Sequence, residues 1–135
     1  MANPPSDPRY LALKAVMMPR DTNPHGTIFG GVILSYIDQA GAVGAYHEIR
    51  QWGTDRKPMV TVGMKSVEFH RPVFVGDVLS FWTHLVREGK TSITIHVEVQ
   101  AEREGQLEKL TEAEVTYVAI ESAGEQRRPV RIRDK

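Results

Sequence analysis

The segment from Thr22 to Tyr46 is mostly apolar or small and contains one formally charged side chain, the carboxylate of Asp38. A carboxylate buried among apolar neighbours without a partner is costly. Such an acid therefore either faces solvent on the outer side of its helix or acts as a general base or nucleophile in a cleft or at an interface. Its position in the sequence leaves both interpretations of Asp38 open.

Polar turn residues precede this segment and end in a double glycine, Gly30-Gly31. Glycines let a ligand approach the backbone closely, and free N–H groups at the start of a helix suit an anion or a developing oxyanion. A turn followed by a helix cap explains the same residues without any function. The phosphate-loop element Gly-Lys-Ser/Thr is missing, and no strand leads into a dinucleotide-binding GxGxxG.

These residues must be positioned by a helix, which we expect from about Gly31 to Arg50 because Ile33 and Ile37 lie one turn apart. Its small residues allow another backbone to pack closely. After Pro58 the apolar residues alternate with period two, which indicates strands near residues 59–70, 78–86, 91–101 and 109–120. Short connections favour antiparallel neighbours. The sequence therefore predicts an α+β domain, with one long helix on an antiparallel sheet of about five strands.

The 135 residues suit one domain, which we expect over residues 11–125, between a disordered lead (1–10) and a basic C-terminal tail (126–135). Lys plus Arg and Asp plus Glu both number 17, so the chain has no net charge and is not expected to bind nucleic acid. The absence of cysteine excludes disulfides and thiolate chemistry. Without a secretory signal pattern or a membrane-length apolar run, we expect a cytoplasmic protein that does not insert into membranes.

Several motifs in order resemble those of the acyl-CoA thioesterases (acyl-CoA hydrolases) of the hotdog fold, over roughly residues 15–130. They are Asn23-x-x-Gly26-x-x-x-Gly30-Gly31 with Asp38 in the following helix, Phe69-x-Arg71-Pro72-Val73, Gly76-Asp77, Gly89-Lys90-Thr91-Ser92, Thr111-Glu112-Ala113 and Tyr117-Val118-Ala119. The resemblance implies a long helix wrapped by the sheet, and two protomers that join their sheets edge to edge. It also implies active sites between protomers, so a homodimer is the minimal unit, often within a hexamer built as a trimer of dimers.

The resemblance also implies roles for single residues in acyl-CoA hydrolysis. Asp38 matches the catalytic acid, as general base or nucleophile, and Asn23 would orient water or substrate across the dimer interface. The amide groups near Gly30 and Gly31 would polarise the thioester carbonyl. Thr27 stands where several relatives carry an acid, and the role of His25, where some carry Asn, is open.

Coenzyme A is highly anionic, so a protein that binds it needs local positive charge. Solvated surface charges explain each basic residue equally well. No cofactor beyond the coenzyme A of the substrate is expected. His70, His84 and His96 do not form a ligand-like cluster in the sequence, so no metal is expected either. The candidate substrate contacts are His25, Gly26, Phe29, Arg71, Lys90, Thr91, Ser92, Arg127 and Arg128.

Two other functions compete with hydrolysis. Asp21-Thr22-Asn23-Pro24-His25 is similar to the Asp-x-Asn-Pro-x-His signature of hotdog enoyl-CoA hydratases, but here Asp and His are four residues apart rather than five. A non-catalytic acyl-CoA-binding sensor is the second alternative. Such sensors usually carry an output domain, for which this chain has no spare length.

Overall fold

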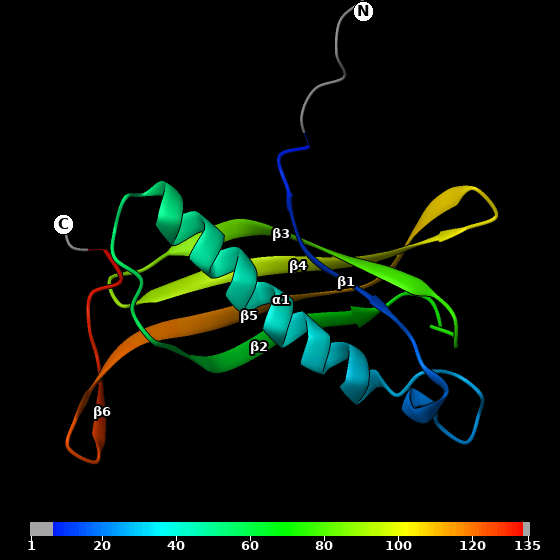
Figure 1. Cartoon of the computed structure of the whole chain (residues 1–135), viewed down its shortest axis with the longest axis horizontal. Helices are drawn as coiled ribbons and strands as arrows, with labels where there is room; N and C mark the ends of the chain where they lie inside the picture. The colour runs from blue at the N-terminus through cyan, green and yellow to red at the C-terminus, as the bar shows by residue number, and fades with distance from the viewer. Residues whose placement is uncertain (1–6, 134–135) are drawn as a thin grey trace, which may run out of the picture.

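The structure is a computed structural model that describes residues 7–133, apart from the side chain of Ala123. Most of the predicted lead, residues 1–6, lies outside the described residues. One long helix crosses one face of an antiparallel sheet (Figure 1). The elements in chain order are β1 (Tyr10–Val16), a 3-10 turn (Pro19–Asp21), α1 (Gly30–Gln51), β2 (Met59–Phe69), β3 (Val78–Glu88), β4 (Ser92–Arg103), β5 (Gln106–Ala123) and β6 (Gln126–Pro129).

The helix lies close to the sheet because small residues face it. A Cβ atom added to Gly41 would lie 2.2 Å from the hydroxyl oxygen of Tyr117 on β5. One added to Gly44 would lie 2.4 Å from the hydroxyl of Thr83 on β3. Only glycine fits at such distances, so the cost of glycine within a helix is offset by the packing of α1 on the sheet. The glycines thus make room for side chains of the sheet, Tyr117 and Thr83, rather than for another backbone.

The strand order is β1-β3-β4-β5-β2, and β6 pairs with β5. Every pair is antiparallel, as predicted. The sheet has six strands, one more than the expected number, and the described residues include two strands, β1 and β6, that the sequence pattern did not reveal. Along β4 the predicted alternation holds, since Ile93, Ile95 and Val97 are buried against α1 while His96 and Glu98 point to the opposite face.

Strand β2 forms one edge of the sheet, because it pairs with β5 alone. Two apolar side chains of β2 are largely exposed, Val62 at 57% and Phe69 at 52%. The pairing with β5 is irregular near Thr61 and again near Ser66, whose φ of 55° is left-handed. A long edge strand with exposed apolar side chains is suited to pairing with another strand.

The C-terminal segment returns to the sheet. After β6, the amide of Val130 donates to the carbonyl of Ala119, and that of Ile132 donates to the carbonyl of Lys90. The side chain of Ile132 is buried. The segment predicted as a basic tail thus contains a short strand and a core residue, and it lies against the turn between β3 and β4. No helix in the described part of the chain is long and apolar enough to cross a membrane.

Candidate active site

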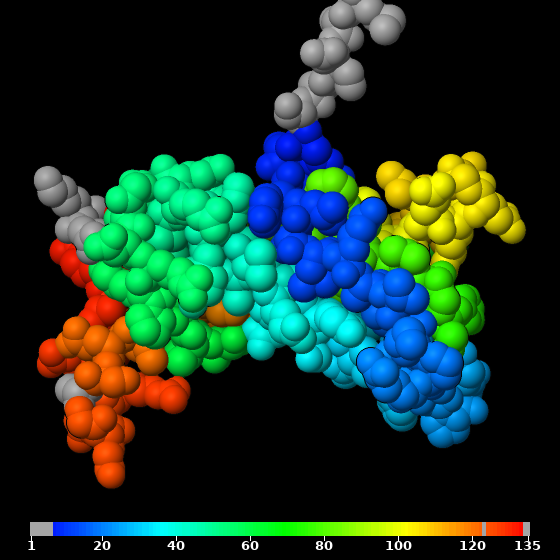
Figure 2. Space-filling view, in the orientation of Figure 1, coloured from blue at the N-terminus to red at the C-terminus, as the bar shows by residue number. Residues whose placement is uncertain are grey.

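Asp38 lies on α1 where the helix runs beside the edge strand β2, and its side chain is half-buried. The hydroxyl of Thr61 on β2 donates a hydrogen bond of 2.7 Å to Oδ1 of Asp38. The space-filling view shows a small part of β5, coloured orange, between α1 and the green segment that leads into β2 (Figure 2). The acid therefore sits at the seam between α1 and the sheet edge, neither in the core nor on the outer side of the helix.

Tyr117 on β5 fixes the backbone of α1 at the same place. Its hydroxyl donates a hydrogen bond of 2.6 Å to the main-chain carbonyl of Asp38. Burial raises the pKa of the Tyr117 phenol, and the nearby negative charge of Asp38 raises it further. Tyr117 therefore remains a neutral donor, and the turn of the helix that carries Asp38 is held to β5.

The predicted site residue Asn23 lies in the loop that precedes α1. Its Oδ1 accepts hydrogen bonds from the amides of His25 and Thr27, and its Nδ2 donates to the hydroxyl of Thr27 at 2.8 Å. These bonds order the loop, in which Gly26 has a left-handed φ of 85°. The side-chain amide has two N–H groups, so one remains for water or substrate.

The start of α1 borders a pocket of about 290 Å³ that Gly30 shares with Phe69, the last residue of β2, and with Arg71 in the loop that follows. A Cβ on Gly30 would lie 3.3 Å from the ring of Phe69, so a larger residue would crowd this pocket. In the first turn of a helix the N–H groups have no acceptor within the helix. Those of Gly30 and Gly31 are therefore available to a ligand at this end of α1.

A single chain does not gather the predicted catalytic residues around one point. Asp38 follows Gly30 by eight residues, which corresponds to roughly 12 Å along the helix axis. Reacting atoms must come within about 3–3.5 Å of each other. The side-chain hydrogen bonds that Asn23 makes with described residues stay within its own loop and do not reach Asp38.

Lys90 lies in a strongly cationic pocket of about 430 Å³ at the turn between β3 and β4. Four cations and one acid, Glu88, line this pocket. The guanidinium of Arg133 donates to Glu88 at 2.9 Å, which holds the C-terminal segment against the turn. The other cationic residues of the pocket are Arg87 and Arg131. The basic residues near the end of the sequence indicated a cationic segment, but no pattern placed Arg131 and Arg133 beside Lys90.

The other predicted substrate contacts are scattered. Thr91 and Ser92 build the turn, where their carbonyls accept the amides of Ala119 and Gly89. Arg128, on β6, forms an ion pair with Glu121. Arg127 is exposed on the same strand, and His25, Gly26 and Phe29 are exposed around the loop before α1.

Sequence reasoning missed the role of Thr61. The strand pattern placed it in a strand, but its contact with Asp38 joins residues 23 positions apart. It also missed a cluster on the far face of the sheet. His70 and His96, which look isolated in the sequence, both approach the carboxylate of Glu112, at 2.6 and 3.5 Å.

Comparison with known proteins identifies the family to which the chain belongs. Residues 25–108 match the family model of the thioesterase superfamily. The acyl-CoA thioester hydrolase YciA of Escherichia coli K12 is 39% identical over 122 residues, which cover 87% of this chain and 88% of that protein. An uncharacterized acyl-CoA thioester hydrolase of Buchnera aphidicola is 41% identical over 120 residues, or 85% of this chain and 84% of the relative.

Solved structures show the same architecture. A hexameric hotdog fold thioesterase of Campylobacter jejuni superposes with a TM-score of 0.74 at 42% identity and covers 89% of both chains. The hexameric thioesterase y2039 of Yersinia pestis superposes with a TM-score of 0.78 at 38% identity, over 93% of this chain and 98% of that one. The chain therefore belongs to the thioesterase superfamily and has its hotdog fold.

Proposed function

We propose that this protein hydrolyses acyl-coenzyme A thioesters to free coenzyme A and a carboxylic acid. The observation that carries the proposal is the carboxylate of Asp38, held by Thr61 at the seam between α1 and the open edge of β2. Relatives that cover nearly the whole chain at about 40% identity are acyl-CoA thioester hydrolases by name, which supports the same substrate class.

Thioester hydrolysis needs a base for water, or a nucleophile, and a donor for the negative charge that develops on the carbonyl oxygen. As a base, Asp38 takes a proton from water while the water oxygen bonds to the carbonyl carbon. The C–S bond then breaks, and the departing coenzyme A thiolate takes up the proton. As a nucleophile, Asp38 itself displaces the thiolate and forms an anhydride, which water then hydrolyses. A single turnover in oxygen-18 water separates the two routes, because only the anhydride route can label Asp38.

The N–H groups of Gly30 and Gly31 are suited to hold the developing oxyanion, because they lie at the positive end of α1. The free N–H of the Asn23 side chain would orient water or the thioester beside them. Within one chain these donors lie far along the helix from Asp38. We therefore assign the Asp38 of one chain and the Asn23, Gly30 and Gly31 of another to the same site.

A homodimer built through β2 supplies this second chain. The strand offers unpaired backbone groups and the exposed side chains of Val62 and Phe69. It also lies beside Asp38, whereas the other edge, β1, does not contact that acid. Two-fold pairing of β2 with its own copy is antiparallel, so each end of the sheet meets the opposite end of the partner sheet. The solved relatives described as hexameric support an assembly of several such pairs.

The cationic pocket around Lys90 is suited to the phosphates of coenzyme A. It holds three more cations than acids, and charged hydrogen bonds to phosphate are strong. The turn between β3 and β4 lies at the opposite end of the sheet from the start of α1 (Figure 1). In the antiparallel dimer the pocket of one chain therefore comes to the same end of the joined sheet as the partner's oxyanion donors. The cytoplasmic location expected from the sequence stays a prediction.

A hydrolysis screen over acyl-CoAs from acetyl to palmitoyl tests the proposal, with free thiol release as the readout. Hydration of an enoyl-CoA is followed in parallel by its absorbance, to test the hydratase alternative. Turnover of at least one chain length with little hydration supports the hydrolase. Tight binding without turnover at every chain length would favour the sensor, and dominant hydration would favour the hydratase.

A further inference from the structure

Three carboxylates form a row across the face of the sheet that points away from α1. Glu112 on β5 pairs directly with Glu68 on β2 and, on its other side, with Glu98 on β4. Like charges directly opposite each other on neighbouring strands destabilise a sheet. A row of this kind therefore needs cations between its members.

The two ends of this row are neutralised in different ways. Glu98 is 2.8 Å from the guanidinium of Arg9 and 3.9 Å from the ammonium of Lys109, which both keep their charge at neutral pH. Glu68, at the other end, has His70 as its one ion-pair partner within residues 7–133. At the Glu68–Glu112 end of the row, Lys109 is the permanent cation among the described residues, 3.0 Å from Glu112, and it is shared with Glu98 at 3.9 Å. Two directly opposed carboxylates thus share part of one lysine and the imidazole of His70.

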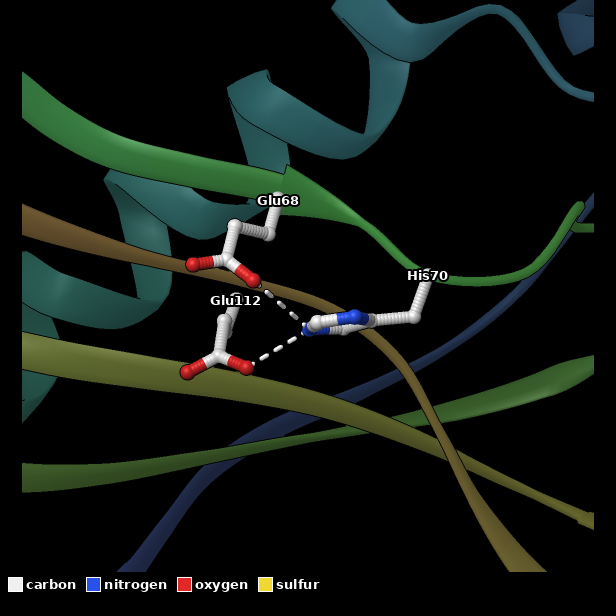
Figure 3. A group of neighbouring side chains, drawn as sticks. All are labelled: Glu68, His70 and Glu112. Carbon is white, nitrogen blue, oxygen red and sulfur yellow. Dashed lines mark hydrogen bonds and ion pairs between the residues drawn. The ribbon is translucent and has the colours of Figure 1, made fainter.

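Glu68, His70 and Glu112 point toward one another at this end of the row (Figure 3). Nε2 of His70 lies 2.6 Å from Oε2 of Glu112 and 3.6 Å from Oε2 of Glu68, and the three ligand atoms all lie within 4.8 Å of one another. Zinc binds such atoms at about 2.0–2.2 Å in tetrahedral geometry, which places neighbouring ligand atoms roughly 3.4 Å apart. Shifts of about an ångström by the flexible glutamate side chains would meet that spacing.

We infer that these three side chains form a binding site for a divalent transition-metal ion of the zinc class. One imidazole nitrogen and two carboxylate oxygens are donors that zinc accepts in three-ligand protein sites, where water completes the coordination. The ion neutralises the directly opposed Glu68 and Glu112. On binding, Lys109 moves its hydrogen bond from Glu112 toward Glu98, which its ammonium already approaches.

The backbone holds the three ligands in place. Glu68 and Glu112 sit opposite each other in the β2–β5 ladder, and the side chain of Glu112 is only 18% exposed. His70 follows β2 directly, and its amide donates to the carbonyl of Leu110 at 2.8 Å, which keeps the ring over β5. A bound ion would link the edge strand β2 to β5 on the face opposite Asp38. Its role is therefore to stabilise the edge strand rather than to act on a thioester.

Zinc titration of the full chain, first stripped with a chelator, tests the site. A competing chromogenic chelator reports the affinity, and thermal unfolding with and without zinc reports the stabilisation. We expect one zinc ion per chain and a higher unfolding temperature with zinc. Substituting a ligand, in His70→Ala or Glu68→Gln, should weaken the affinity by at least about tenfold and remove the thermal shift. Glu102→Gln, an exposed acid on β4 outside the row, is the matched control and should leave both unchanged.

Two results would overturn the proposal: no saturable binding of zinc at one ion per chain, or equal affinity in the wild type and both ligand variants. If His70→Ala does not fold, Glu68→Gln decides alone, because the Glu68 side chain is 62% exposed and its loss removes little packing. Neither readout involves hydrolysis, so the outcome is independent of the proposed enzymatic function.

Discussion

The hydroxyl of Thr61 donates a hydrogen bond of 2.7 Å to Oδ1 of Asp38 and joins the edge strand β2 to the helix α1. The phenol of Tyr117 also lies beside this carboxylate, so β2 and β5 both hold the turn of α1 that carries Asp38. Thr61 is thus a positioning residue: it selects one orientation of the carboxylate without itself touching the thioester.

Replacing Thr61 by valine tests this role. Thr61→Val keeps the shape of the side chain and removes the donor, so we expect kcat to fall by about 10- to 100-fold, which corresponds to a hydrogen bond to a charged group. KM should change much less, because Thr61 does not contact the coenzyme. Steady-state kinetics provide both numbers.

The serine variant supplies the control for that experiment. Thr61→Ser restores the hydroxyl and should recover most of kcat, whereas a role of Thr61 in packing alone would impair serine, which lacks the methyl group, and spare valine. Thr94→Val removes a hydroxyl bonded to Thr116 on the opposite face of the sheet and should leave kcat unchanged. Equal turnover in Thr61→Val and the wild type would show that the hydrogen bond does not orient Asp38 for catalysis.

Lys90→Ala tests whether the cationic pocket binds the phosphates of coenzyme A. Loss of one charged contact should raise KM for an acyl-CoA by about tenfold, with little effect on kcat. The rise in KM should be smaller at high salt, because salt screens the contact between Lys90 and phosphate. An acyl-N-acetylcysteamine thioester has no phosphate, so the variant and the wild type should hydrolyse it equally well. Lys14→Ala, at an exposed position on β1 at the other edge of the sheet, is the matched control. An equal loss on both substrates would place Lys90 outside phosphate binding.

The raised pKa of Tyr117 predicts that the stability of the folded protein falls at alkaline pH. Its folded-state pKa is raised above the ordinary value of about 10, so the unfolded chain loses the phenolic proton first. The stability that this group contributes is complete below pH 10 and is lost as the pH rises from there toward the higher folded-state pKa. The unfolding temperature should fall more steeply above pH 10 in the wild type than in Tyr117→Phe. Tyr10→Phe serves as control and should follow the wild type; identical profiles for all three proteins would contradict the role of burial at Tyr117.

Much of the fold could be predicted from local pattern. The spacing of Ile33 and Ile37 identified α1 to within a residue at each end, and the alternation along β4 identified its buried face. The sequence pattern did not reveal strand β1. Its residues are half-buried on both faces at the sheet edge, so apolar and polar residues do not alternate clearly along it. Strand β6 has four residues and no buried side chain, so nothing in its pattern separates it from a tail.

The candidate site was only partly predictable, for a physical reason. Asp38 is conspicuous as the one charged residue in an apolar segment, and Gly30 marks the start of the helix. The contacts of Asp38 with Thr61 and Tyr117 depend on how α1 crosses the sheet, which no local pattern encodes. The same holds for Lys90 and Arg133, which lie 43 positions apart in sequence and share one pocket.

The proposed sharing of the site between chains predicts complementation of two inactive variants. Asp38→Asn and Asn23→Ala each damage one half of the site. In dimers refolded from an equal mixture, half of the molecules contain both variants, and each of these has one fully native site. About a quarter of the wild-type activity should therefore return, as follows from the two-fold symmetry. If both residues act within one chain, no mixed dimer contains a native site, and the rate stays at the average of the two variants.

The turnover of Asp38→Asn with an acyl-CoA that the wild type hydrolyses tests the central claim most directly. The amide oxygen of the substituted side chain can still accept the hydrogen bond of Thr61, so the variant removes the charge and basicity of the carboxylate while its position is kept. Asp55→Asn, an exposed acid beyond the end of α1, controls for the substitution itself. We predict a kcat lower by roughly 10²- to 10⁴-fold in a protein of unchanged oligomeric mass; turnover close to that of the wild type would contradict the account.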